Sequence, residues 1–147
     1  MTVNRLTDPV ISLFRMVVGL LFLMRGMSSI FGVFGGSQGS GEAIEVGVWP
    51  HWWAALIQLV GGLLVLVGLW ARPAAVICSG SMAYAYFVVH QPMALLPMNN
   101  RGELAALFCW SFLLIAVVGA GRWSLDALLG RRREGVRGRE TAAAVAS

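Results

Sequence analysis

The feature that most limits the fold is a set of four long apolar stretches, each bounded by turn residues or charges. They cover about residues 10–32, 52–70, 73–90 and 103–121. At about 18–25 residues, each is long enough to cross about 30 Å of hydrocarbon as a helix. A backbone in lipid must satisfy its own hydrogen bonds, which excludes open strands. The sequence therefore predicts an all-α, polytopic membrane protein, in which residues 1–130 form a bundle of four transmembrane helices.

The composition excludes other classes of protein. Of the 147 residues, 58% are hydrophobic and only 12% are charged, whereas a soluble domain carries about 25% charged residues. A chain this apolar cannot stay open and solvated as a disordered protein. Its length suits one domain, because a domain takes roughly 100–200 residues. A single domain embedded in the lipid bilayer is the class that remains.

The positive charges predict the orientation of the helices. All eleven basic residues are arginines, and five of them lie in residues 131–147. With both termini in the cytoplasm, eight arginines lie on the cytoplasmic side and the outer loops keep only Arg101. The excess of positive charge on the inner side favours this orientation. Residues 131–147 are then a disordered, basic cytoplasmic tail. The net charge of +4 reflects the membrane topology, and we expect no nucleic acid as a partner.

The tryptophans fit the same topology. Five of them fall near the ends of the apolar stretches, where aromatic residues line the membrane interfaces: Trp49, Trp52, Trp53, Trp70 and Trp123. Trp110 is the exception, and we expect it to be buried at mid-depth.

Four polar residues fall in the outer third of the membrane, one on each helix. Counting about 1.5 Å of rise per residue places Arg25, Gln58, His90 and Glu103 at this level. Charged side chains at membrane depth are costly and usually face the interior of a bundle. The layer is either a ligand or redox site or a purely structural hydrogen-bond network, and the residues alone leave both open.

Two helices carry a face with regular spacing. On the first helix one face holds Arg15, Gly19, Phe22, Gly26 and Ser29. The small residues allow a neighbouring helix to approach closely, and Arg25 lies beside this face. On the third helix, Met82, Tyr86 and His90 follow one another at i, i+4 and i+8. That face could hold a flat ring, although core packing explains the same spacing.

The cysteines and metal-binding residue types give little support to redox chemistry within the chain. Depth counting places Cys78 and Cys109 roughly 13 Å apart along the membrane normal, whereas a disulfide needs Cα atoms within about 7 Å. The sequence contains no Cys-x-x-Cys and no Glu-x-x-His. We therefore predict no haem, no di-metal centre and no other metal site.

The last hairpin carries the most distinctive motif. It starts with Asn99-Asn100-Arg101-Gly102-Glu103 and ends with Gly119-Ala120-Gly121-Arg122-Trp123-Ser124-Leu125-Asp126. This pattern resembles the DoxX family of small four-span bacterial membrane proteins. The earlier helices are similar to the family in the same order, through Arg15 to Gly26, Gly61 to Ala75 and Met82 to His90. The resemblance covers about residues 10–129.

The resemblance implies a multi-pass protein of the bacterial inner (plasma) membrane that is associated with membrane redox chemistry, linked to quinones or thiols. Two positions depart from the family pattern. The family often has a lysine near the position of Ser29 and a glutamate near that of Gln58. By position, Glu103 and Asp126 carry over best. Their structural roles would be a favourable charge at a helix N-terminus for Glu103, and a cap or a partner of Arg122 for Asp126.

Two hypotheses follow for function. In the first, the chain is an oxidoreductase subunit that binds a quinone. Arg25 and His90 would bind the quinone oxygens and Glu103 would orient His90 or relay its proton, which makes these three the candidate catalytic residues. The rest of the hypothetical ligand site would be Gln58, Met82 and Tyr86.

In the second hypothesis, the chain is a non-catalytic scaffold or anchor subunit. It would hold partner proteins at the membrane through the outer loop at residues 32–50 or through the basic tail. The partners expected under the two hypotheses are the lipid bilayer, redox partner proteins and a second copy of the chain.

Overall fold

The computed structural model describes residues 3–130, and every regular element within them is helical. The main helices are α1 (Val3–Phe31), α2 (His51–Val67), α3 (Ala71–Tyr84) and α5 (Glu103–Val118). Short elements join them: the 3-10 turn η1 (Ser37–Gly39), the π-helical turn η2 (Ala85–His90), which continues α3, and α4 (Pro97–Asn100). The predicted all-α fold is confirmed for this part of the chain. The tail predicted at residues 131–147 lies outside the described residues.

Three helix limits differ from the prediction, each for a local reason. α1 begins at Val3 and runs through Pro9, whose ring holds φ at a helical value while one backbone hydrogen bond is lost. α2 ends at Val67 because Gly68 adopts a left-handed φ of 72°, the usual conformation of a helix C-cap. α5 ends at Val118, because Gly119 leaves the helix with φ 101°.

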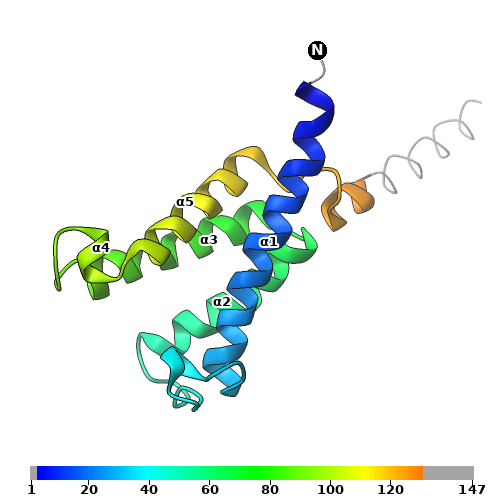
Figure 1. The fold of residues 1–147 in the computed structure, drawn as a ribbon. Helices are drawn as coiled ribbons and strands as arrows, with labels where there is room; N and C mark the ends of the chain where they lie inside the picture. Colours follow the sequence, from blue (N-terminus) through cyan, green and yellow to red (C-terminus); the bar gives the residue numbers. More distant parts are fainter. Residues whose placement is uncertain (1–2, 131–147) are drawn as a thin grey trace, which may run out of the picture.

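The four long helices form two pairs that cross each other (Figure 1). α1 packs along α2, α3 packs along α5, and α2 also contacts α3. Glycines bring α1 and α2 together: a Cβ added at Gly19 would lie 2.6 Å from the backbone nitrogen of Leu66. A Cβ added at Gly62 would lie 2.6 Å from the backbone nitrogen of Leu23. The close approach predicted for the first helix is therefore confirmed.

An aromatic core joins the first pair to the second. Phe22 of α1 is fully buried, and its ring centroid lies 4.6 Å from that of Phe112 and 5.2 Å from that of Phe108, both in α5. Such aromatic pairs add about 0.5–1.5 kcal/mol each to the stability gained by burying the rings. Val65 and Ile115 complete the centre of the cluster.

The outer surface of the two pairs is apolar, as expected of helices in lipid. Large hydrophobic side chains are exposed on all four long helices, among them Leu21, Leu63, Val76 and Leu107. The stretches Thr7–Phe31 and Ala71–His90 are long and apolar enough to cross a membrane, whereas α2 and α5 are shorter apolar helices.

The expectation that Trp110 is buried is wrong. Its side chain is 69% exposed. Phe108 and Phe112, two residues to either side, point into the core from the opposite face of α5. Trp110 therefore lies on the outward face of this helix.

Candidate functional site

The buried guanidinium group of Arg15 connects α1 to the end of α2 and to the segment after α5. The residue is only 1% exposed, and all three of its nitrogens donate hydrogen bonds to backbone carbonyls. Nη1 donates to the carbonyl oxygens of Val65 and Leu66, the latter at 2.6 Å. Nε donates to Ala120 O at 2.8 Å, and Nη2 donates to Trp123 O at 2.6 Å. A charge that is costly to bury is thus stabilised by four charge-assisted hydrogen bonds.

The carbonyl groups around Arg15 come from the end of α2 and from the segment after α5. Val65 and Leu66 lie in the last turn of α2, where carbonyl groups lack intrahelical donors and the helix dipole is negative. Gly68 makes room for the guanidinium group, because a Cβ there would lie 2.9 Å from Nη1 of Arg15. A cation on α1 therefore binds the end of α2.

The segment after α5 closes the site from the other side. Asp126 accepts hydrogen bonds from the backbone N–H groups of Trp70 (3.1 Å) and Ala71 (3.3 Å), and so caps the N-terminus of α3. Its own backbone N–H donates to Gly68 O at 3.0 Å, and its carboxylate attracts Arg15 electrostatically. We call this arrangement the Arg15 joint: Arg15, the α2–α3 turn at residues 65–71, and the segment at residues 120–126.

The joint is also tied to the first turns of α1. The hydroxyl of Ser12 donates to Asp8 O at 2.8 Å and accepts from the backbone N–H of Trp123 at 3.3 Å. Of the two roles expected for Asp126, the structure supports the cap. Arg122 instead lies 3.9 Å from the carboxylate of Asp8, and both side chains are at least half exposed.

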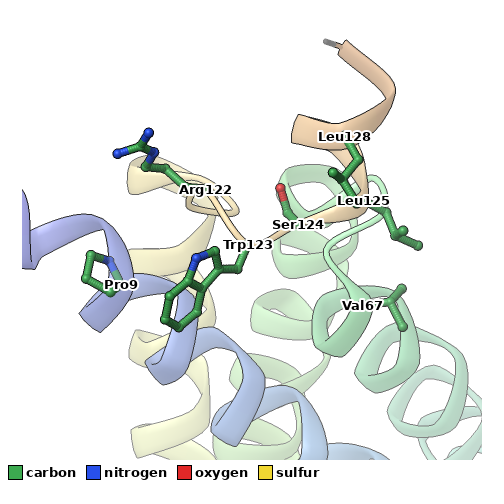
Figure 2. A pocket seen from close by; sticks show the side chains of 7 residues that line it. All are labelled: Pro9, Val67, Arg122, Trp123, Ser124, Leu125 and Leu128. Carbon is green, nitrogen blue, oxygen red and sulfur yellow. The ribbon is translucent and has the colours of Figure 1, made fainter. Parts of the chain in front are cut away.

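A hollow of about 630 Å³ opens beside the Arg15 joint (Figure 2). It is lined by Pro9, Val67, Arg122, Trp123, Ser124, Leu125 and Leu128. The lining is mainly apolar, and Arg122 is the charged side chain at its rim. The hydroxyl of Ser124 donates to Gly121 O at 3.0 Å and accepts from Ala127 N at 3.2 Å. The hydroxyl is therefore engaged in capping the short helix at residues 125–130 rather than set up as a nucleophile.

At the far end of the α3–α5 pair, His90 lies in a network with Asn100. The Nδ1 atom of His90 lies 2.9 Å from Asn100 O. Because a carbonyl oxygen only accepts, Nδ1 carries the proton and neutral His90 keeps its lone pair on Nε2. The side chain of Asn100 is 1% exposed. It donates to Ala94 O and accepts from Gly102 N, both at 2.8 Å.

Two further residues of the predicted ligand face lie near this end. Met82 is buried in the core, and Tyr86 is half-buried against it. The ring of Tyr86 lies close to Gly102, because a Cβ added to Gly102 would be 2.9 Å from two carbons of the Tyr86 ring. The structure therefore places Tyr86 and His90 at the same end of the α3–α5 pair, with Met82 deeper in the core.

Of the other three predicted site residues, Glu103 lies at the same end as His90, whereas Arg25 and Gln58 lie on the α1–α2 pair. Arg25 is exposed on α1, Gln58 is half-buried on α2, and Glu103 is exposed in the first turn of α5. The two helix pairs cross, so the α1–α2 connection and α4 lie at the ends of different pairs (Figure 1), although Trp49 of the connection contacts Tyr84 of α3 with ring centroids 6.4 Å apart. The structure does not bring Arg25 and Gln58 together with His90 around one ring. Quinone binding by any of these residues remains a prediction.

The two cysteines are free thiols that pack in the same core cluster, and the depth difference predicted for them is wrong, because Ser79, next to Cys78, contacts Cys109. Cys78 is buried beside Gly61, and the half-buried Cys109 lies against Ser79, whose hydroxyl donates to Cys109 O at 2.8 Å. Within residues 3–130, no three His, Cys, Asp or Glu side chains gather in a group that could hold a metal ion.

Sequence reasoning missed the parts played by Asn100, Ser12 and Ser79. Their side chains are buried and bonded to backbone groups. In the sequence, a buried polar residue that bonds backbone groups looks the same as an exposed polar residue. For Asn100 a signal did exist, because it belongs to the motif that carries the family resemblance.

Comparison with known proteins identifies the family. The model of the DoxX family matches residues 10–91. The chain belongs to the DoxX family. It is 34% identical over 119 residues to an uncharacterized protein of Haemophilus influenzae, covering 76% of this chain and 84% of that protein.

Two other relatives of this DoxX-family chain are named as membrane proteins. The inner membrane protein YqjF of Escherichia coli is 28% identical over 134 residues, covering 88% of this chain and 98% of YqjF. The uncharacterized membrane protein Rv3486 of Mycobacterium tuberculosis is 31% identical over 140 residues, covering 84% of this chain and 83% of Rv3486. No solved structure matches the chain. These relatives and the apolar helices identify a multi-pass protein of the inner membrane.

Proposed function

We propose that this DoxX-family protein crosses the membrane four times with both termini in the cytoplasm. Arg72 and Arg122 are exposed at the end of the molecule that carries the Arg15 joint. Glu42 and Glu45 are exposed in the α1–α2 connection, at the opposite end of α1. The positive-inside rule puts the joint on the cytoplasmic side. The hydrogen bonds of the joint then hold the 65–71 turn and the 120–126 segment at the same inner surface.

Labelling in intact cells tests this orientation. A membrane-impermeant maleimide should modify Ser40→Cys, which lies in the exposed part of the outer loop, and should leave Leu128→Cys unmodified until the membrane is permeabilised. The unaltered protein supplies the background from Cys78 and Cys109. Labelling of Leu128→Cys in intact cells would contradict the proposed orientation.

We further propose that the protein is a non-catalytic anchor subunit of a membrane redox system. One observation carries this proposal: the motif residues of the chain are engaged in building the fold. Arg15 donates to four carbonyls, Asp126 caps α3, and Ser124 caps the helix that follows. In the described part of the chain, no buried side-chain nitrogen or oxygen lacks a hydrogen-bond partner. These groups are therefore suited to holding helices rather than to transferring protons.

The second candidate is a quinol-binding subunit, which is favoured by the tautomer of His90. With the proton held on Nδ1 by Asn100 O, the lone pair on Nε2 can accept a hydrogen bond from a hydroxyl group. The half-buried ring of Tyr86 lies at the same end of the helix pair. This version of the ligand site uses His90 and Tyr86 without Arg25 or Gln58.

Purification of the full chain from its native membrane in a mild detergent separates the two candidates. Native mass spectrometry of the product should show a partner protein at a fixed ratio and no retained quinone. The matched test is a titration with a soluble quinone analogue, using His90→Phe and Arg25→Gln as variants. A chain that purifies alone, and binds the analogue saturably unless His90 is changed, would overturn the anchor role and support the second candidate.

A further inference from the structure

The hollow beside the Arg15 joint has two chemically different sides. Arg122 lies at the rim on the side of α1, and Val67, Leu125 and Leu128 lie on the side of α2 (Figure 2). The volume of about 630 Å³ falls in the usual range of ligand pockets, about 300–1,000 Å³. Leu125 and Leu128 are 41% and 55% exposed. A ligand that matches this lining carries an anionic group next to an apolar body.

The guanidinium group of Arg122 is accessible to an anion. Its Nε lies 3.9 Å from the carboxylate of Asp8, and the two side chains are 68% and 50% exposed. An ion pair this long and this exposed adds little to stability. The planar guanidinium group can donate two parallel hydrogen bonds to a phosphate. A phosphate group can therefore compete with Asp8 for Arg122, whereas the guanidinium group of Arg15 is already bonded within the fold.

The hollow lies at the level of the lipid headgroups. The stretch Thr7–Phe31 has 25 residues, about 37 Å of helical rise, and so exceeds the hydrocarbon layer of about 30 Å. Asp8 and Pro9 lie in the first turn of this stretch, at its end beside the joint. Trp123 is 60% exposed, and tryptophan is enriched at membrane interfaces. Water and lipid phosphates both reach this level.

We propose that the hollow binds a phospholipid with a negatively charged headgroup, and its position in the inner leaflet rests on the orientation proposed above. Arg122 binds the phosphate, and the first part of an acyl chain lies against Val67, Leu125 and Leu128. Basic pockets on the cytoplasmic side of membrane proteins recognise such headgroups. The bound lipid contacts α1, the end of α2 and the segment after α5, and so joins the same three parts as the Arg15 joint.

Charge also excludes the rest of the chain as the occupant. Residues 131–147 contain five arginines and two glutamates, so their net charge has the same sign as that of Arg122. Like charges repel each other. An anionic lipid, by contrast, has a charge opposite to that of the rim and an apolar part that suits the rest of the lining.

Lipid titration of the purified full chain in a mild detergent tests the proposal. Native mass spectrometry gives the apparent Kd of phosphatidylglycerol, which is anionic, and of phosphatidylcholine with the same acyl chains, which has no net charge. Arg122→Gln and Asp8→Asn change the charge at the rim in opposite directions. The matched control is Arg101→Gln, which removes an exposed arginine just before α5. Glycerol phosphate serves as a headgroup without acyl chains.

We expect phosphatidylglycerol to bind about five- to tenfold more tightly than phosphatidylcholine. Arg122→Gln should remove most of this preference, and Arg101→Gln should leave it unchanged. Asp8→Asn should tighten the binding of phosphatidylglycerol about two- to threefold, because the competing carboxylate is gone. Glycerol phosphate at the same concentration should not displace the lipid, because it lacks the apolar part.

Equal affinities for the two lipids, or equal losses for Arg122→Gln and Arg101→Gln, would overturn the proposal. Weaker binding of phosphatidylglycerol by Asp8→Asn would also contradict it, because the carboxylate would then help to hold the lipid. Displacement by glycerol phosphate would favour a soluble phosphate compound instead. Binding in micelles does not depend on orientation, so labelling of Leu128→Cys in intact cells would contradict the orientation and leave the lipid site standing.

Discussion

At the scale of single residues, the neighbouring asparagines Asn99 and Asn100 have different surroundings. Asn99 is exposed, whereas Asn100 is buried and bonds two backbone groups, Ala94 O and Gly102 N. A buried polar group that loses its partner costs about 1–3 kcal/mol. The side chain of Asn100 is therefore expected to hold the connection between η2 and α5 in its conformation.

We predict that Asn100→Ala lowers the free energy of unfolding by about 2 kcal/mol, because Ala94 O and Gly102 N both lose a buried partner. Asn99→Ala, one position away, should leave stability unchanged. The measurement is the thermal unfolding midpoint of both variants in the same detergent. Equal midpoints for the two variants would show that the Asn100 network does not stabilise the connection.

At the scale of elements, the close approach of α1 and α2 depends on glycine. A Cβ at Gly26 would lie 2.7 Å from the Cα of Leu59, in the backbone of α2. Backbone atoms cannot move aside as a flexible side chain does, so the two helices would have to separate. Gly80 of α3 is the opposite case, since an added Cβ there meets nothing within 4 Å.

Gly26→Ala should therefore lower the free energy of unfolding by about 1–3 kcal/mol, the usual cost of overpacking. Gly80→Ala should leave it unchanged or raise it by up to about 1 kcal/mol, because alanine favours a helix over glycine. Chemical unfolding of the two variants in the same micelles gives the comparison. Similar losses for both would contradict the claim that the close contact of α1 with α2 at Gly26 decides the effect.

The elements were largely predictable from the sequence, and their arrangement was not. Apolar length and bounding turn residues predicted the four long helices, and the spacing from Arg15 to Gly26 predicted the face of α1 that packs. Depth counting, however, assumed straight, nearly parallel helices. Because the two pairs cross, Arg25 of α1 and His90 of η2 can lie at similar depths and still belong to different helix pairs, whose ends diverge (Figure 1).

At the scale of the whole molecule, the Arg15 joint connects segments that are far apart in the sequence. Arg15 binds carbonyls about 50 and about 105 residues further along the chain. The sequence indicated that this arginine lies on the packed face of α1. It did not indicate the partners, because backbone carbonyls belong to every residue and only the fold brings these four together. Arg25 belongs to the ligand hypothesis through its predicted depth in the outer third of the membrane, which carries no information on packing partners.

The central claim is that the buried cation of α1 is part of the fold, and comparison of Arg15→Gln with Arg25→Gln tests it most directly. Both variants remove one positive charge from the same helix, but only Arg15→Gln strips buried carbonyls of their donors. We expect Arg15→Gln to lower the free energy of unfolding by about 3–5 kcal/mol. The measurement is the yield of folded, monodisperse full-length protein and its thermal unfolding midpoint in one detergent. We predict little or no folded Arg15→Gln, or a midpoint far below that of the unaltered protein, with Arg25→Gln unchanged. An Arg15→Gln variant as stable as the unaltered protein would contradict the account.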